Sequence, residues 1–203
     1  QPAEIHIELA RELKIPASAR AKIERSNGKR RAERDKIRKQ ASGWLGRPEA
    51  DIPRKLLDKL ELFEEQGGLD VYMGEGGEID RDTLLRDPTY AEIDHILPYS
   101  RSLDDSRANK VLVLAKSNQD KGNRTPYEWM TSGEASAPSW EAFCAQVQGR
   151  RESMSAKKAE NLTCRDFAHK ESEFIKRNLN DTRYMTTKMA QWFEDELLFS
   201  DSD

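Results

Sequence analysis

The sequence predicts an α+β fold that is mainly α-helical, with one small β element near its centre. Charged residues make up 35% of the 203 residues and hydrophobic residues 36%, a balance typical of amphipathic, densely charged helices. Helical periodicity and helix start and stop signals cover most of the chain. In its interior, two strand-like apolar runs stand close together, at about residues 90–97 and 109–115.

The first fifth of the chain combines a strand pattern with a basic helix. Residues 5–9 alternate apolar and other side chains, the period of a strand, and have no obvious partner nearby. Residues 17–41 predict a long charged helix, interrupted at 26–29 and ended by Gly43. Residues 20–39 alone hold ten Lys or Arg against three Asp or Glu, in a chain of net charge −3. This basic face is compatible with contact to a phosphate backbone, and its alternative is a solvated, salt-bridged helix.

The remaining helices are predicted from amphipathic patterns and capping signals. Residues 53–68 form an amphipathic pattern that two glycines close. Thr125, Pro126 and Glu128 have the spacing of an N-cap, a first helical residue and a capping box. A helix is expected to start at about Ser139 and to continue as a charged stretch to about Arg177. A last amphipathic helix is expected after Asn180.

The two central strands, their loop and the following helix form a β–loop–β–α unit. Ser117 is a candidate cap for that helix. Polar residues stand at the corners of the unit: Asp94 and His95 near the end of the first strand, Asn109 at the start of the second, and Asn118 at the start of the helix. If these corners converge, they make a functional site.

Phosphodiester hydrolysis is one chemistry that such a site can perform. Asp94 and the amide carbonyl of Asn118 are oxygen ligands of the kind that Mg²⁺ prefers, and His95 can act as a general base at neutral pH. A regular strand would point Asp94 and His95 to opposite faces, so a shared site needs the strand to end or bulge there, with which Pro98 is consistent. The alternative is a satisfied Asp–His pair beside ordinary turn and cap residues.

Residues 92–129, EIDHILPYSRSLDDSRANKVLVLAKSNQDKGNRTPYEW, resemble the HNH nuclease domain of the type II CRISPR effectors, the single-protein RNA-guided DNA endonucleases. Residues 125–129 and 177–184 look most like the compact type II-C branch. Residues 5–12 resemble the second RuvC motif of the same enzymes, and residues 179–191 resemble the linker that returns towards the third motif. The resemblance therefore implies a central ββα-metal (HNH) motif surrounded by helices.

This resemblance divides the chain into four parts. Residues 1–12 would be a remnant of the RuvC-like second motif, and residues 13–49 a basic helical linker outside the domain core. Residues 50–170 would be the HNH nuclease domain, and residues 171–203 a second linker helix. The chain would then be a piece of a longer effector.

The resemblance also implies a role for each site residue. His95 would be the general base, Asp94 and Asn118 would be ligands of Mg²⁺, for which Mn²⁺ is a plausible substitute, and the amide of Asn109 would hold the loop and orient the site. Replacing Asp94 or Asn118 is expected to weaken metal binding with little loss of fold.

The resemblance also bears on two further residues. Lys121 falls where the family places a basic residue near the phosphate, and its alternative is a solvated lysine. Glu8 matches a metal carboxylate of the RuvC site, but its partners are missing from this sequence, so no activity is expected from it. The two cysteines form no CxxC pair, which argues against a structural zinc site.

The implied function is a metal-dependent DNA endonuclease that cuts the target strand paired with guide RNA, by water that a histidine activates. Its partners would be that heteroduplex and the other domains of the parent effector. We expect a monomer in the prokaryotic cytoplasm, without a membrane span. The alternatives are a catalytically silent nucleic-acid-binding or hinge module and a free-standing HNH homing-type nuclease.

Overall fold

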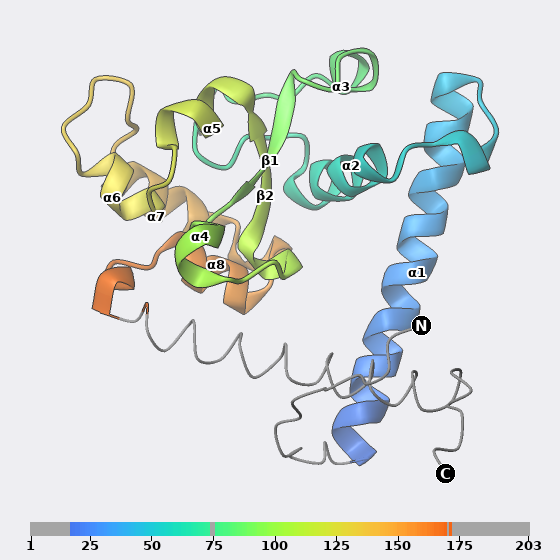
Figure 1. The fold of residues 1–203 in the computed structure, drawn as a ribbon, viewed down its shortest axis with the longest axis horizontal. Coiled ribbons are helices and arrows are strands. Elements are labelled where there is room, and N and C mark those ends of the chain that lie inside the picture. Colours follow the sequence, from blue (N-terminus) through green and yellow to red (C-terminus); the bar gives the residue numbers. More distant parts are fainter. Residues whose placement is uncertain (1–16, 74–75, 170, 172–203) are drawn as a thin grey trace, which may run out of the picture.

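The computed structural model describes residues 17–73, 76–169 and 171 of the chain (Figure 1). The strand predicted at residues 5–9, with Glu8, lies outside the described residues. So does the helix predicted after Asn180. The described part is mainly helical around a two-stranded antiparallel sheet, so the predicted fold class is confirmed.

The sheet is a short ribbon of β1 (Ala91–His95) and β2 (Lys110–Leu114). Its register pairs Ala91 with Leu114, Asp94 with Val111 and His95 with Lys110. The ladder continues one residue past β1, because the backbone N–H of Ile96 donates to the carbonyl of Asn109 at 2.9 Å. The strand is therefore regular up to and beyond the Asp94–His95 pair.

Each face of the ribbon is covered by a separate hydrophobic core. On one face, Val111 and Val113 pack with Tyr72, Trp129 and residues of the later helices. These helices are α6 (Pro126–Met130), α7 (Trp140–Gly149) and α8 (Ala156–Leu162). On the other face, Ala91 and Leu112 pack against α2 (Arg54–Gln66). Two faces buried on different elements pin the register, because a slip of one residue would exchange them.

The basic helix α1 (Ala17–Leu45) is longer and more regular than predicted. It runs through Asn27 and Gly28, and Gly46 follows it with a positive φ of 59°. The predicted interruption and the predicted end at Gly43 are wrong. An isolated helical glycine costs about 1 kcal/mol, which a helix of 29 residues tolerates.

The C-terminal half of α1 belongs to the domain core. Ile37 is 8% exposed and Ala41 is fully buried, and both pack in the core that contains Leu57 and Leu60 of α2. Figure 1 shows α1 beyond α2 on one side of the ribbon, with α6 to α8 on the other. The expectation that this helix lies outside the core is wrong for this half.

Short elements join these parts. They are the 3₁₀ turns Glu49–Asp51, Arg107–Asn109 and Arg151–Ser153, and the helices α3 (Arg81–Arg86), α4 (Tyr99–Ser102) and α5 (Ala115–Lys121). Helix α2 ends at Gly67, whose φ is 65°, as its closing glycines predict. An isolated antiparallel bridge joins Leu69 to Glu78 beyond it.

The capping signals had mixed outcomes. The capping box of Thr125 and Glu128 at the start of α6 is present, with Pro126 in the first turn, and that prediction is confirmed. Ser117 is not a cap, because α5 already begins at Ala115, directly after β2. The helix predicted to continue towards Arg177 instead ends at Gly149. A new helix begins after Ser155, whose side chain accepts a hydrogen bond from the N–H of Lys158.

Among the described helices, none is both long and apolar enough to cross a membrane.

Candidate active site

Asp94 is a buried carboxylate with two strong partners. Its side chain leaves β1 on the face of Val111 and is 7% exposed. The hydroxyl of Tyr72 donates to Asp94 Oδ2 at 2.6 Å. Complete burial, together with the Asp94 charge, raises the pKa of Tyr72 well above its usual value, so the phenol stays protonated and serves as a donor.

The second partner of Asp94 is Lys121, which is only 1% exposed. Its Nζ lies 3.1 Å from Asp94 Oδ1 and 3.0 Å from Oδ2, and it also donates to the backbone carbonyl of His95 at 3.0 Å. Desolvation lowers the pKa of Lys121, and the Asp94 charge opposes this shift. The solvated-lysine alternative is wrong. In this arrangement the ammonium faces Asp94, so contact with a phosphate requires this ion pair to open.

Asn118 lies beside a carboxylate that the sequence reasoning missed. Its Nδ2 donates to Glu92 Oε2 at 2.6 Å, which leaves the carbonyl Oδ1 as an acceptor. Asn118 and Lys121 stand one turn apart on α5, and Glu92 and Asp94 stand two residues apart on one face of β1. Helix and strand thus pair Asn118 with Glu92 and Lys121 with Asp94. The two-residue period of the strand is the signal that could have identified Glu92.

The oxygen atoms on this face suit a hard divalent cation in their chemistry. Glu92, Asp94 and the amide of Asn118 offer carboxylate and carbonyl oxygens, the ligands that Mg²⁺ takes, usually together with waters and substrate phosphate. The described residues contain no cluster of three or more His, Cys, Asp or Glu side chains arranged for a metal ion. The ammonium of Lys121 supplies the positive charge beside Asp94. The donor set therefore fits Mg²⁺ if the side chain of Lys121 gives way.

His95 points away from this group. As the last residue of β1 it follows Asp94 in regular register, so the two side chains leave the strand on opposite faces. The structure does not bring His95 onto the face that holds Asp94 and Asn118, because the strand has no bulge. The imidazole instead lies 5.4 Å, between ring centroids, from the half-exposed ring of Tyr99.

His95 has an acidic partner, Asp105, in the loop between the strands. His95 Nε2 and Asp105 Oδ1 lie 2.9 Å apart, and Lys110 Nζ lies 2.6 Å from the same oxygen. Partial desolvation acts to raise the pKa of Asp105, but hydrogen bonds from Lys110 and His95 outweigh it and lower the pKa below its usual value. An ionised carboxylate only accepts, so this contact favours the tautomer that carries its proton on Nε2, and in the neutral ring that tautomer has its lone pair on Nδ1. The sequence reasoning missed Asp105, although this residue lies in the loop between the two predicted strands.

Asn109 makes the contacts of a residue that holds a loop. It is fully buried. Its Nδ2 donates to the carbonyls of Leu97 and Asp104, each at 2.9 Å, and its Oδ1 accepts from the N–H of Leu97 at 2.9 Å. These three bonds tie both ends of the loop between β1 and β2, on which Asp105 lies.

Comparison with known proteins places this arrangement in a class. A family model described as HNH endonuclease matches residues 70–127, which contain the whole ββα unit and its polar residues. The fold and this match define an HNH endonuclease domain. The described ribbon and α5 are the ββα motif that the resemblance implied.

The relatives narrow the class. The chain is 36% identical over 192 residues to CRISPR-associated endonuclease Cas9 1 of Streptococcus thermophilus, a match that covers 89% of this chain and 16% of the relative. It is 52% identical over 77 residues to Cas9 of Campylobacter jejuni, covering 38% of this chain and 8% of the relative. The chain belongs to the HNH endonucleases of the CRISPR Cas9 family. It spans less than a fifth of the length of these two relatives.

Solved structures agree. The crystal structure of Streptococcus thermophilus Cas9 in complex with the AGAA PAM superposes with a TM-score of 0.66 at 32% identity, over 92% of this chain and 18% of that one. The Type II-C Cas9 from Actinomyces naeslundii matches with a TM-score of 0.51 at 20% identity, over 72% of this chain and 15% of that one, which shows the fold alone. The type II-C assignment stays a prediction.

Proposed function

We propose that this endonuclease domain hydrolyses a phosphodiester bond of the DNA strand that is paired with guide RNA, with His95 as the general base. The observation that carries the proposal is the contact between His95 and Asp105 at the end of β1. With Nε2 donating to Asp105, Nδ1 would be the proton acceptor, on a side chain that is 27% exposed.

In the proposed reaction His95 Nδ1 takes a proton from a water molecule, and the water oxygen attacks the phosphorus in line with the leaving 3′ oxygen. Asp105 holds the ring and balances the positive charge that the imidazole gains. Tyr72 fixes one oxygen of Asp94, which limits the directions in which that carboxylate turns. The expected products are a 5′ phosphate and a 3′ hydroxyl.

Asp94 and Asn118 would hold Mg²⁺, for which Mn²⁺ would substitute, and Glu92 would orient the amide of Asn118. The ion would neutralise the charge that develops on the phosphate and the leaving oxygen. Because Asp94 and His95 leave β1 on opposite faces, the phosphate would have to lie at the end of the strand, where it can reach both. The ion pair between Lys121 and Asp94 would have to open as the ion binds, which would release an ammonium near the phosphate. Lys121 would then be able to contact the phosphate, which is the role that the resemblance implies for it.

Guide RNA, target DNA and the other domains of a longer effector are proposed as partners, in the prokaryotic cytoplasm. The support is the homology to Cas9, one member of which was crystallised as a complex with its PAM. The described residues contain no further domain that would read a base sequence, so pairing with a guide would supply specificity. Glu8 is proposed only as a RuvC-like carboxylate without activity in this chain.

The test measures cleavage of each DNA strand separately by the His95→Ala variant. The domain is carried in a full-length effector, of the relatives' length, that is loaded with guide RNA. We expect target-strand cleavage to fall by about 10²–10⁴-fold, with unchanged binding of the target. His169→Ala is the matched control, because His169 is exposed and outside the motif. Parallel reactions in Mg²⁺, Mn²⁺ and EDTA test the metal. Target-strand cleavage by His95→Ala within a few-fold of the parent rate would refute the assignment of His95 as the general base.

A further inference from the structure

A groove with an excess of positive charge lies between α1, α2 and the ribbon. Its volume is about 530 Å³. Three acidic side chains line it, those of Asp58, Glu61 and Asp105. Six cationic side chains line it as well, those of Arg30, Arg31, Arg34, Arg54, Arg107 and Lys110. The groove therefore carries twice as many positive as negative groups.

Two of these cations have no partner within the described part of the chain. Arg34 binds Asp58 at 2.8 Å and Glu61 at 2.9 Å, and the other acids of the groove are engaged as well. No hydrogen bond or ion pair of Arg31 or Arg54 occurs among the described residues, and both are exposed. Helix α2 begins at Arg54 and has no acidic residue in its first turn, so this turn offers that guanidinium no counter-charge.

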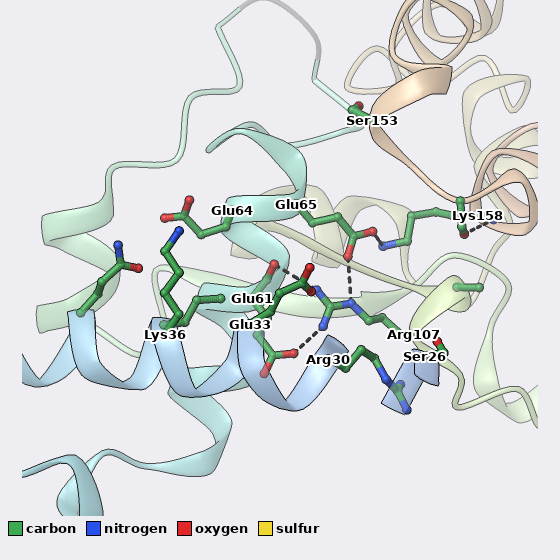
Figure 2. Close-up of a pocket in the computed structure, with 14 residues that line it drawn as sticks. Ser26, Arg30, Glu33, Lys36, Glu61, Glu64, Glu65, Arg107, Ser153 and Lys158 are labelled. Atoms are coloured by element: carbon green, nitrogen blue, oxygen red, sulfur yellow. Dashed lines mark hydrogen bonds and ion pairs between the residues drawn. The ribbon is translucent and has the colours of Figure 1, made fainter. Parts of the chain in front are cut away.

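The neighbouring hollow shows what a balanced pocket looks like in this protein (Figure 2). It has a volume of about 630 Å³ and lies between α1, α2 and α8. Arg107 pairs with Glu61 and with Glu65, and Lys158 donates to Glu65 at 2.6 Å. Four carboxylates face four cations there. The positive excess is thus a property of the groove and not of every hollow along α1.

The groove reaches residues that neighbour His95. Ile93 lines it, and Ile93 and His95 lie on the same face of β1. Asp105 and Lys110 line it too, and Asp105 Oδ1 is the oxygen that His95 Nε2 and Lys110 Nζ share. A strand lying along the groove would therefore arrive at the imidazole.

We propose that this groove binds the sugar-phosphate backbone of the nucleic-acid strand that the domain cuts, with Arg31 and Arg54 as its two free phosphate ligands. Guanidinium groups suit this task, because their forked donors match phosphate oxygens. An acidic protein segment would meet the same charges. The nucleic acid is favoured because Asp105 and Lys110, which line the groove, are the neighbours of His95, the proposed general base. The inference rests on the proposed function and extends it from the site of cleavage to the path of the substrate.

The test compares binding of a fluorescein-labelled RNA–DNA heteroduplex to the full chain by anisotropy, in EDTA and from 50 to 200 mM NaCl. Arg31→Gln/Arg54→Gln removes the two proposed ligands. Lys29→Gln/Lys39→Gln is the control, since it removes the same charge from exposed positions of α1 outside the groove. The slope of the logarithm of the binding constant against the logarithm of the NaCl concentration falls in magnitude by about 0.7–0.9 for each lost phosphate contact. The groove variant should therefore show a slope smaller by about 1.5 and bind at least about fivefold more weakly.

The control variant should keep most of its affinity and slope. Equal losses in both variants would mean diffuse attraction to α1, and no loss in the groove variant would mean that the strand runs elsewhere. Either result overturns the proposal. So does stronger competition by poly-glutamate than by single-stranded DNA of equal charge, which would assign the groove to an acidic protein segment. Because binding is measured without metal, a failure here is separate from a failure of the His95→Ala cleavage test.

Discussion

Asp105 Oδ1 lies 2.9 Å from His95 Nε2. This contact favours the tautomer of the neutral ring that holds its proton on Nε2, because an ionised carboxylate can only accept. The pairing comes from the loop between β1 and β2, whose two ends Asn109 ties together. A loop residue thus favours one tautomer of a strand residue.

Asp105→Asn should slow cleavage about tenfold without weakening substrate binding. The amide can present its N–H₂ to Nε2 and so favour the wrong tautomer, with the lone pair on the wrong nitrogen. Asp105 is 66% exposed, which argues for a modest effect. Single-turnover cleavage at saturating enzyme measures it, and Asp105→Glu should recover part of the rate. Equal losses for Asn and Glu would show that the loop, and not the carboxylate, matters.

Asp94→Ala should destabilise the fold, which changes the expectation from sequence that only metal binding would suffer. The substitution leaves the ammonium of Lys121 buried without its counter-charge, and such a loss typically costs about 3–5 kcal/mol. Urea unfolding measures it. Asp94→Ala/Lys121→Met should recover most of the loss, since it removes both charges. If the double variant is no more stable than Asp94→Ala, the ion pair is not the cause.

Ile37→Ala should lower the free energy of unfolding by about 2–4 kcal/mol, because it empties a buried position shared by α1 and α2. Ile23→Ala is the matched control, since Ile23 is 48% exposed on the same helix, and it should change stability little. Hydrogen exchange adds a second measurement. Amides around Ile37 and Ala41 should be protected nearly as well as those of β2, and fast exchange there would make all of α1 a linker.

Glu128→Gln should destabilise the protein by about 1–2 kcal/mol at pH 7, and the difference should vanish in acid. Partial burial acts to raise the pKa of Glu128, but hydrogen bonds from Arg101 and the N–H of Thr125 lower it below its usual 4.5. A carboxylate with a lowered folded pKa stabilises the fold above pH 4.5, and this stability is lost as pH falls through the folded value. Gln preserves the capping box. Urea unfolding of both proteins from pH 7 to pH 3 checks this, and a pH-independent difference would contradict it.

The sequence by itself determined the ββα unit and its polar corners. Alternating apolar runs, the capping box at Thr125 and the glycine after α2 are local signals, and local signals decide elements wherever tertiary contacts agree with them. The length of α1 was not decided in this way. Packing of Ile37 and Ala41 on α2 outweighs the weak propensity of Gly28 and Gly43.

Only the tertiary structure decided which of the polar residues meet. Regular pairing up to His95 sends Asp94 and His95 to opposite faces, and the helix places Lys121 on Asp94 and Asn118 on Glu92. Asp105 meets His95 across a loop whose path depends on the buried amide of Asn109. Composition and spacing do not predict such contacts. The direction of each side chain follows from the register of the strands and from the packing of the helix on them.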